Sequence, residues 1–142
     1  MAVPSRIGRI PSVEDPLKGF RIAVKDIFEI AGMKTSVCNR AYCELYPPPK
    51  KTAACVQILS DAGADIVGTT KLASFAATEE PVECIDYQAP WNPRADGYQS
   101  PAGSSSGSGA AAAAYEWLDI TIGSDSEFTG EATSGLERIT GC

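Results

Sequence analysis

The apolar and polar positions in the first third of the chain predict extended structure followed by a loop. Residues 20–24 (FRIAV) alternate weakly and are rich in strand-forming types, which predicts a strand ending at Lys25 and Asp26. A second short extended piece is expected over 27–30. Residues 46–51 contain three consecutive prolines, which lack an amide donor and fix φ, so this stretch must be a loop.

A helix and a second strand are predicted after this loop. Apolar residues recur at helical spacing over 53–62, with Thr52 as the expected N-cap and Gly63 as the residue that stops the helix. Residues 64–68 (ADIVG) have the short apolar character of a buried strand. The succession of strand, helix and strand predicts an α/β fold.

The rest of the chain shows weaker periodicity. We expect an irregular lead-in over 1–18, one or two helical turns over 71–77, and a buried strand over 118–123. Residues 81–101, between the predicted helical turns and the predicted strand over 118–123, form a long loop, and loops of this length usually carry function.

Residues 100–109 (SPAGSSSGSG) are the densest compositional feature, and five alanines follow them directly. A Gly/Ser run of this kind can be a flexible linker. The alanines favour instead a small-residue helix, at whose start several hydroxyls and backbone N–H groups converge. No lysine follows Gly107 or Gly109, so a Walker-type phosphate loop does not fit. We therefore expect a functional site at this run.

The overall composition fits a globular domain and limits its chemistry. Apolar residues make up 44% and charged residues 21% of the 142-residue chain. A net charge of −6 offers no basic surface for nucleic acid or an anionic membrane. The sequence contains no histidine, which excludes serine-histidine and cysteine-histidine catalysis and metal sites built on imidazole. We expect neither a metal nor a cofactor.

The cysteines and the N-terminal sequence predict a cytoplasmic location. The five cysteines form an odd set without a C-x-x-C pair, which indicates neither a zinc ribbon nor a complete disulfide framework. We expect buried, reduced thiols. Residues 1–16 lack the apolar core of a secretory signal, and no apolar run reaches the roughly 20 residues of a membrane span.

In the absence of histidine, a lysine is the natural candidate for a general base. Lys25 stands at the predicted end of a strand, and burial beside the apolar residues before it would lower its pKa. A lysine after a strand is more often a solvated surface residue, so the position alone leaves both interpretations open.

Five collinear segments resemble the amidase signature family, and together they cover about residues 16–126 in one order and register. The first contains Lys25, and the fourth is the Gly/Ser run. The peptides YQSP and YEWLD resemble the fungal branch of amidase-like proteins. The resemblance implies the N-terminal portion of a mixed-sheet fold with helices packed around it. The five segments are 19–26 with 31–35, 62–71, 91–93, 101–108 and 123–126.

The resemblance implies hydrolysis of a small-molecule amide by a Ser-Ser-Lys triad. On the matching positions, Lys25 starts the proton relay, and Ser104 is the bridging serine, which the family holds in a cis peptide. Ser105 is the alternative in register, although the ungapped match over 101–103 favours Ser104. Lysine and serine would then perform the proton transfers that histidine performs elsewhere.

The resemblance breaks at residue 127. The family continues with two glycines and the nucleophilic serine, and the glycines let backbone N–H groups form the oxyanion hole. Glu127 and Phe128 stand at the glycine positions, and Thr129 stands at the position of the nucleophile. A carboxylate beside a developing oxyanion is repulsive, so we do not expect Thr129 to act as a nucleophile.

We therefore divide the chain into an irregular lead-in (1–18), a partial amidase domain (19–126) and a divergent tail without resemblance to the family (127–142). The expected protein is a truncated amidase that is inactive as written. The alternative is a non-catalytic binding or scaffold protein derived from an amidase.

Overall fold

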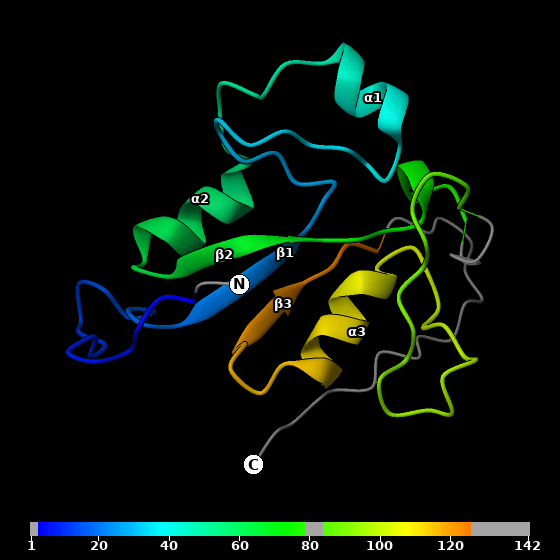
Figure 1. The fold of residues 1–142 in the computed structure, drawn as a ribbon. Helices are drawn as coiled ribbons and strands as arrows, with labels where there is room; N and C mark the ends of the chain where they lie inside the picture. Colours follow the sequence, from blue (N-terminus) through cyan, green and yellow to red (C-terminus); the bar gives the residue numbers. More distant parts are fainter. Residues whose placement is uncertain (1–2, 79–83, 126–142) are drawn as a thin grey trace.

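A three-stranded parallel sheet forms the centre of the molecule. The computed structural model describes residues 3–78 and 84–125. The strand order is β2-β1-β3, and both neighbours run parallel to the central strand. This arrangement confirms the predicted α/β class (Figure 1). The elements are β1 (Arg21–Lys25), α1 (Arg40–Leu45), α2 (Ala54–Asp61), β2 (Asp65–Thr70), the 3-10 turn η1 (Ser74–Ala76), α3 (Ser106–Ala114) and β3 (Ile120–Ile122).

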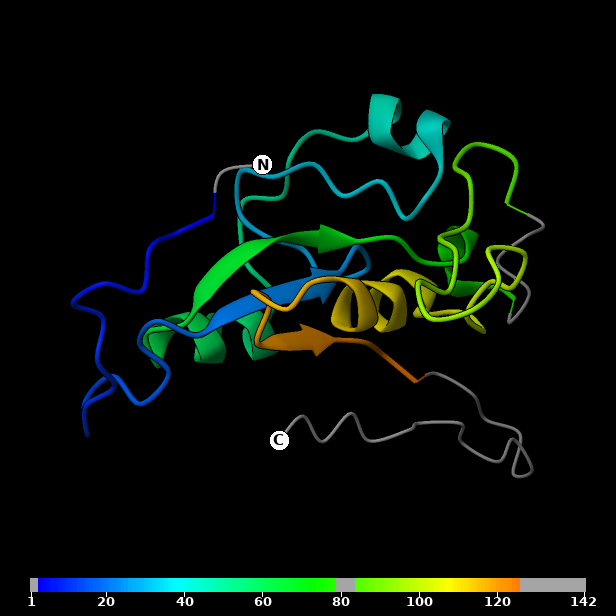
Figure 2. The same cartoon turned by 60° about the horizontal axis from the view of Figure 1, so that its bottom comes forward.

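The central strand β1 is buried because helices cover both faces of the sheet. Ile22 and Val24 have no exposed surface, and they pack with Val56 of α2 in the main hydrophobic cluster. Successive side chains of a strand point to opposite faces, so Ala23 and Lys25 face the other side. Helix α3 lies on that side, opposite α2 (Figures 1 and 2).

Hydroxyl groups tie α3 to both edge strands. The Ser108 hydroxyl lies 2.8 Å from the Thr70 hydroxyl at the end of β2, and it donates to the carbonyl oxygen of Ile122 in β3 at 3.1 Å. A serine hydroxyl carries one hydrogen, so Thr70 must be the donor to Ser108. Both side chains are buried, which makes this short chain of hydrogen bonds part of the core.

The strands and the Gly/Ser helix agree with the sequence pattern. The three predicted strands are present, with ends shifted by one or two residues. The second half of the Gly/Ser run begins helix α3, where Ser106, Gly107 and Ser108 are buried. Burial of these residues contradicts the linker interpretation. The predicted helical turns over 71–77 reduce to the single turn η1.

Three local expectations were wrong in detail or incomplete. Ala53, not Thr52, is the N-cap of α2, because the Thr52 hydroxyl accepts the Ala31 N–H at 3.1 Å. The extended piece expected over 27–30 is reduced to Ile30, which forms an isolated antiparallel bridge with Met33, because the chain before it turns where the Phe28 N–H donates to the Lys25 carbonyl. Helix α1 was not predicted, because it has no buried residue and therefore no apolar periodicity.

The cysteines differ partly from expectation. All four in the described residues are free thiols, but Cys55 on α2 is exposed rather than buried. Cys38 is buried, and Cys43 and Cys84 are half-buried. Cys142 lies outside the described residues, as does the whole stretch 126–142. No helix within 3–78 and 84–125 has the length and apolar character needed to cross a bilayer.

Candidate active site

The candidate site lies where the three parallel strands end. Lys25 is the last residue of β1, Thr70 is the last residue of β2, and Ser124 follows β3 by two residues. The carboxyl ends of parallel strands meet at one edge of a sheet, which is where open α/β sheets place their ligands. The loop that leads into α3, with Ser104 and Ser105, reaches the same edge.

Lys25 is the centre of this site. Its side chain has no exposed surface. The Nζ atom donates to Ser104 Oγ at 2.6 Å and to Ser124 Oγ at 2.8 Å, and lies 3.4 Å from the Ser124 carbonyl oxygen. The solvated-surface interpretation of Lys25 is therefore wrong, because the lysine is buried and bonded to two hydroxyls.

The environment favours the neutral form of this lysine. Burial lowers the pKa of Lys25 below the ordinary value of 10.5, and the Asp125 carboxylate opposes this shift. Desolvation disfavours the charged ammonium, whereas a nearby negative charge stabilises it. A lysine with a lowered pKa is neutral, and able to accept a proton, at a lower pH than an exposed one.

Ser104 is fixed by its backbone as well as by its hydroxyl. The peptide bond between Gly103 and Ser104 is cis. The carbonyl oxygen of Ser104 accepts the Ala73 N–H at 3.0 Å. The loop is thus attached to the segment that follows β2, and the hydroxyl is presented to Lys25.

Ser105, the alternative in register, has different partners. Its hydroxyl accepts the Ser124 N–H at 3.1 Å and donates to the Ser124 carbonyl oxygen at 3.1 Å. A Cβ atom at Gly123 would lie 2.9 Å from this hydroxyl, so the glycine leaves room for the contact. Ser105 thereby holds the chain after β3 in place, and Ser124 reaches Lys25 as a consequence.

Sequence reasoning assigned no role to Ser124 or to Asp26, and both belong to the site. Asp26 is buried beside Lys25 along the chain, and its carboxylate accepts the N–H of Ser36 at 2.9 Å and the hydroxyl of the same residue. The Asp26 N–H donates to the Thr70 carbonyl oxygen at 3.0 Å. The motif over 123–126 pointed to Ser124. No local pattern, however, shows that its hydroxyl accepts a hydrogen bond from Lys25, which is 99 positions away.

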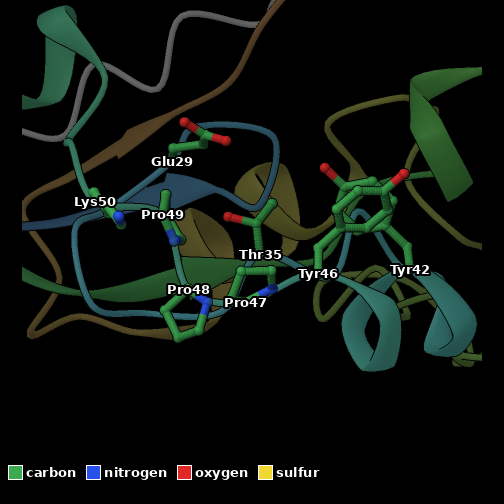
Figure 3. A pocket seen from close by; sticks show the side chains of 8 residues that line it. All are labelled: Glu29, Thr35, Tyr42, Tyr46, Pro47, Pro48, Pro49 and Lys50. Carbon is green, nitrogen blue, oxygen red and sulfur yellow. The ribbon is translucent and has the colours of Figure 1, made fainter.

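Two surface pockets are lined by other residues. One, of about 300 Å³, lies between α1 and the proline loop and is lined by Tyr42, Tyr46, Lys50 and their neighbours (Figure 3). The other, of about 370 Å³, is lined by Cys84, Trp91 and their neighbours. Neither includes Lys25 or Ser104. No group of three or more cysteine or carboxylate side chains within the described residues is arranged to hold a metal ion.

A family model described as Amidase matches residues 7–127. The chain belongs to the amidase family. The match includes Lys25, the cis peptide and the Gly/Ser run. Thr129 lies outside the described residues.

Curated relatives of this amidase-family chain include plant and archaeal proteins. The chain is 39% identical over 115 residues to Amidase 1 of Oryza sativa subsp. japonica, covering 81% of this chain and 26% of that protein. It is 37% identical over 115 residues to a subunit of the glutamyl-tRNA(Gln) amidotransferase of Natronomonas pharaonis, covering 81% and 26%. The chain thus spans about a quarter of the length of these relatives.

Solved structures show the same partial overlap. The chain resembles a structure described as a vestigial protein complex that reveals the origins of an s-triazine catabolic enzyme, with a TM-score of 0.68 and 34% identity. That match covers 84% of this chain and 25% of the other. A match to the Kluyveromyces lactis allophanate hydrolase has a TM-score of 0.57 and 34% identity, and it covers 65% of this chain and 14% of that one.

Proposed function

We propose that this chain supplies the proton-relay half of an amide hydrolase, with Lys25 as the base and Ser104 as the bridging serine of a Ser-Ser-Lys triad. The single observation that carries the proposal is the 2.6 Å hydrogen bond between Lys25 Nζ and Ser104 Oγ in a buried site. Family membership supports amide C–N bonds as the chemical class of the substrate.

In this proposal the proton moves in two steps. Neutral Lys25 accepts the hydroxyl proton of Ser104, while Ser104 accepts the proton of a nucleophilic hydroxyl that attacks the amide carbonyl. When the C–N bond breaks, the proton returns along the same path to the departing amine, and water then cleaves the acyl ester left on the nucleophilic hydroxyl. Lowering of the Lys25 pKa by burial favours the first step, and the bond to Ser124 holds the amine toward Ser104.

We propose that the chain as written does not complete this reaction. Glu127 and Phe128 stand where the family has the two glycines of the oxyanion-hole loop, and Thr129 stands where it has the nucleophilic serine. A glutamate in the oxyanion-hole loop would repel the negative charge of the tetrahedral intermediate. A non-catalytic binding or scaffold role is the alternative that these substitutions favour.

The test has two arms. Ammonia release from a panel of aliphatic and aromatic primary amides is measured with the 142-residue chain and with K25A, and the two are expected to match the buffer blank. Residues 1–125 are then grafted in place of the corresponding quarter of the rice Amidase 1. The chimera is expected to hydrolyse amides and to lose at least 100-fold in rate with K25A or S104A. A chimera whose activity is insensitive to both substitutions would refute the assignment.

We further propose a cytoplasmic location and a small-molecule amide as the partner of a longer form, without nucleic acid or a membrane. The odd set of five cysteines without a C-x-x-C pair supports a reducing compartment. The net charge of −6 supports the absence of a polyanionic partner. The peptides YQSP and YEWLD support a fungal-type member of the family.

A further inference from the structure

Two thiols lie along the segment that supports Ser104. The Leu72 N–H donates to Cys38 Sγ at 3.4 Å, and the Ser74 N–H donates to Cys84 Sγ at 3.1 Å. Between these two donors, the Ala73 N–H donates to the Ser104 carbonyl oxygen at 3.0 Å. Consecutive amide groups of one short segment thus hold the two sulfur atoms and the loop of the candidate active site.

We propose that Cys38 and Cys84 form a reversible disulfide, so that this thiol pair is an oxidation site next to the candidate active site. The two thiols come from segments far apart in the sequence, and backbone donors only two residues apart, those of Leu72 and Ser74, bind them. Neither residue takes part in the proposed proton relay. The disulfide would join the loop that carries Ser36 to the loop that carries Cys84.

The surroundings of the two cysteines determine the order of reaction. Cys84 is half-buried, whereas only 4% of Cys38 is exposed. Burial raises the pKa of Cys38, and the negative charges of Asp26 and of an ionised Cys84 add to this shift, while the Leu72 N–H and Lys71 oppose it. A buried, protonated thiol is a poor first nucleophile. Cys84 therefore reacts first, and Cys38 resolves the intermediate.

The chemistry requires an oxidised low-molecular-mass disulfide, such as glutathione disulfide. The Cys84 thiolate attacks one sulfur of that disulfide, its S–S bond breaks, and one thiol leaves as a thiolate that then takes up a proton. Cys38 then loses its proton to solvent and attacks the Cys84 sulfur, which releases the second thiol. Two protein thiols are oxidised and one external disulfide is reduced to two thiols.

The chain offers a matched control for this reaction. Cys55 lies on α2, on the opposite side of the sheet from α3, and it is exposed. Exposure alone would make it the most readily modified of the four thiols that the structure describes. Cys55 lies outside the segment whose backbone donors hold Cys38 and Cys84, so it is expected to stop at the mixed disulfide with glutathione.

Trypsin separates the relevant residues, which makes the product readable by mass spectrometry. Cys38 falls in peptide 35–40, Cys84 in peptide 72–94, and Cys55 in peptide 52–71. The 142-residue chain is incubated with glutathione disulfide, alkylated and digested, once in buffer and once in about 8 M urea. The cross-linked peptide 35–40/72–94 is expected to be at least tenfold more abundant in buffer than in urea.

Two variants distinguish a disulfide that depends on the pairing of Cys38 with Cys84 from one that depends only on thiol reactivity. C84S is expected to abolish the cross-linked peptide and leave Cys38 reduced, whereas C55S is expected to leave its yield unchanged. The proposal is overturned if the yield in buffer does not exceed that in urea. It is equally overturned if Cys84 accumulates as a glutathione adduct while Cys38 stays free.

Discussion

The backbones of Gly107 and Lys71 approach so closely that no side chain fits between them. The Gly107 N–H donates to the Lys71 carbonyl oxygen at 3.0 Å. A Cβ atom at Gly107 would lie 2.5 Å from both the nitrogen and the carbonyl oxygen of Lys71. This contact attaches the first turn of α3 to the chain after β2, three residues beyond Ser104.

G107A is therefore expected to destabilise the chain by about 1–3 kcal/mol, because the added methyl group forces the two backbones apart. The matched control is G109A in the same helix, where the nearest atom, Cβ of Pro101, is 4.0 Å away. That substitution is expected to be neutral or to stabilise by up to about 1 kcal/mol, as alanine favours the helix. Urea unfolding of the two variants provides the measurement: equal midpoints would show that the close contact has no energetic consequence.

Because Ser108 makes two hydroxyl hydrogen bonds and Thr70 only one of them, substitutions at these two positions are expected to cost different amounts of unfolding free energy. S108A removes both the acceptor of the Thr70 hydroxyl and the donor to Ile122, so it is expected to cost about 1–3 kcal/mol of unfolding free energy. T70V keeps the shape of the threonine side chain and leaves Ser108 bonded to Ile122, so its loss of unfolding free energy is expected to be smaller. Denaturant unfolding measures both, and a larger loss in T70V would contradict the assigned direction of these bonds.

Burial of Lys25 makes stability depend on pH with a definite sign. Below the lowered pKa of Lys25, the folded and unfolded chains both carry the ammonium, and folding bears the full cost of burying it. Above 10.5 both states are neutral and the cost is gone. Between these limits the unfolded chain binds more protons, so stability rises with pH.

Wild type is thus expected to gain stability relative to K25M as the pH rises toward 10.5, because the variant carries no charge to bury. Thermal unfolding of both proteins, followed from about pH 7 to pH 10.5 with reducing agent present, gives the difference at each pH. Parallel curves would mean that Lys25 is not desolvated in the folded chain.

Local pattern was sufficient for the elements that bury an apolar face. The strand containing Ile22 and Val24 and the helix containing Val56 were predictable because their side chains alternate or recur with the period of the element. Helix α1 was not predictable in this way, although Asn39 caps it: the side-chain oxygen of Asn39 accepts the Tyr42 N–H at 2.8 Å. An exposed two-turn helix leaves only this capping signal in the sequence.

The site needed more than local pattern. Lys25 and Ser104 are 79 positions apart, and only the resemblance to the amidase signature family paired them before the structure did. Ser124 and Asp26 were missed because their contacts depend on the parallel register of β1 with β3 and on the return of the chain at Ser36. Thr52 was wrongly predicted to cap α2 for a similar reason, because its hydroxyl accepts a hydrogen bond from Ala31, which is 21 positions away.

The most direct test of the account is the titration of Lys25 itself. NMR of the chain with labelled lysine follows each side-chain amine over pH, and K25M identifies the Lys25 signal by its loss. The Lys25 midpoint is expected below 10.5, and lower still in S104A, where the ammonium loses an acceptor at 2.6 Å. S60A, at an exposed serine of α2, is expected to leave it unchanged. A midpoint at 10.5 that S104A does not move would contradict the proposed proton relay between buried Lys25 and Ser104.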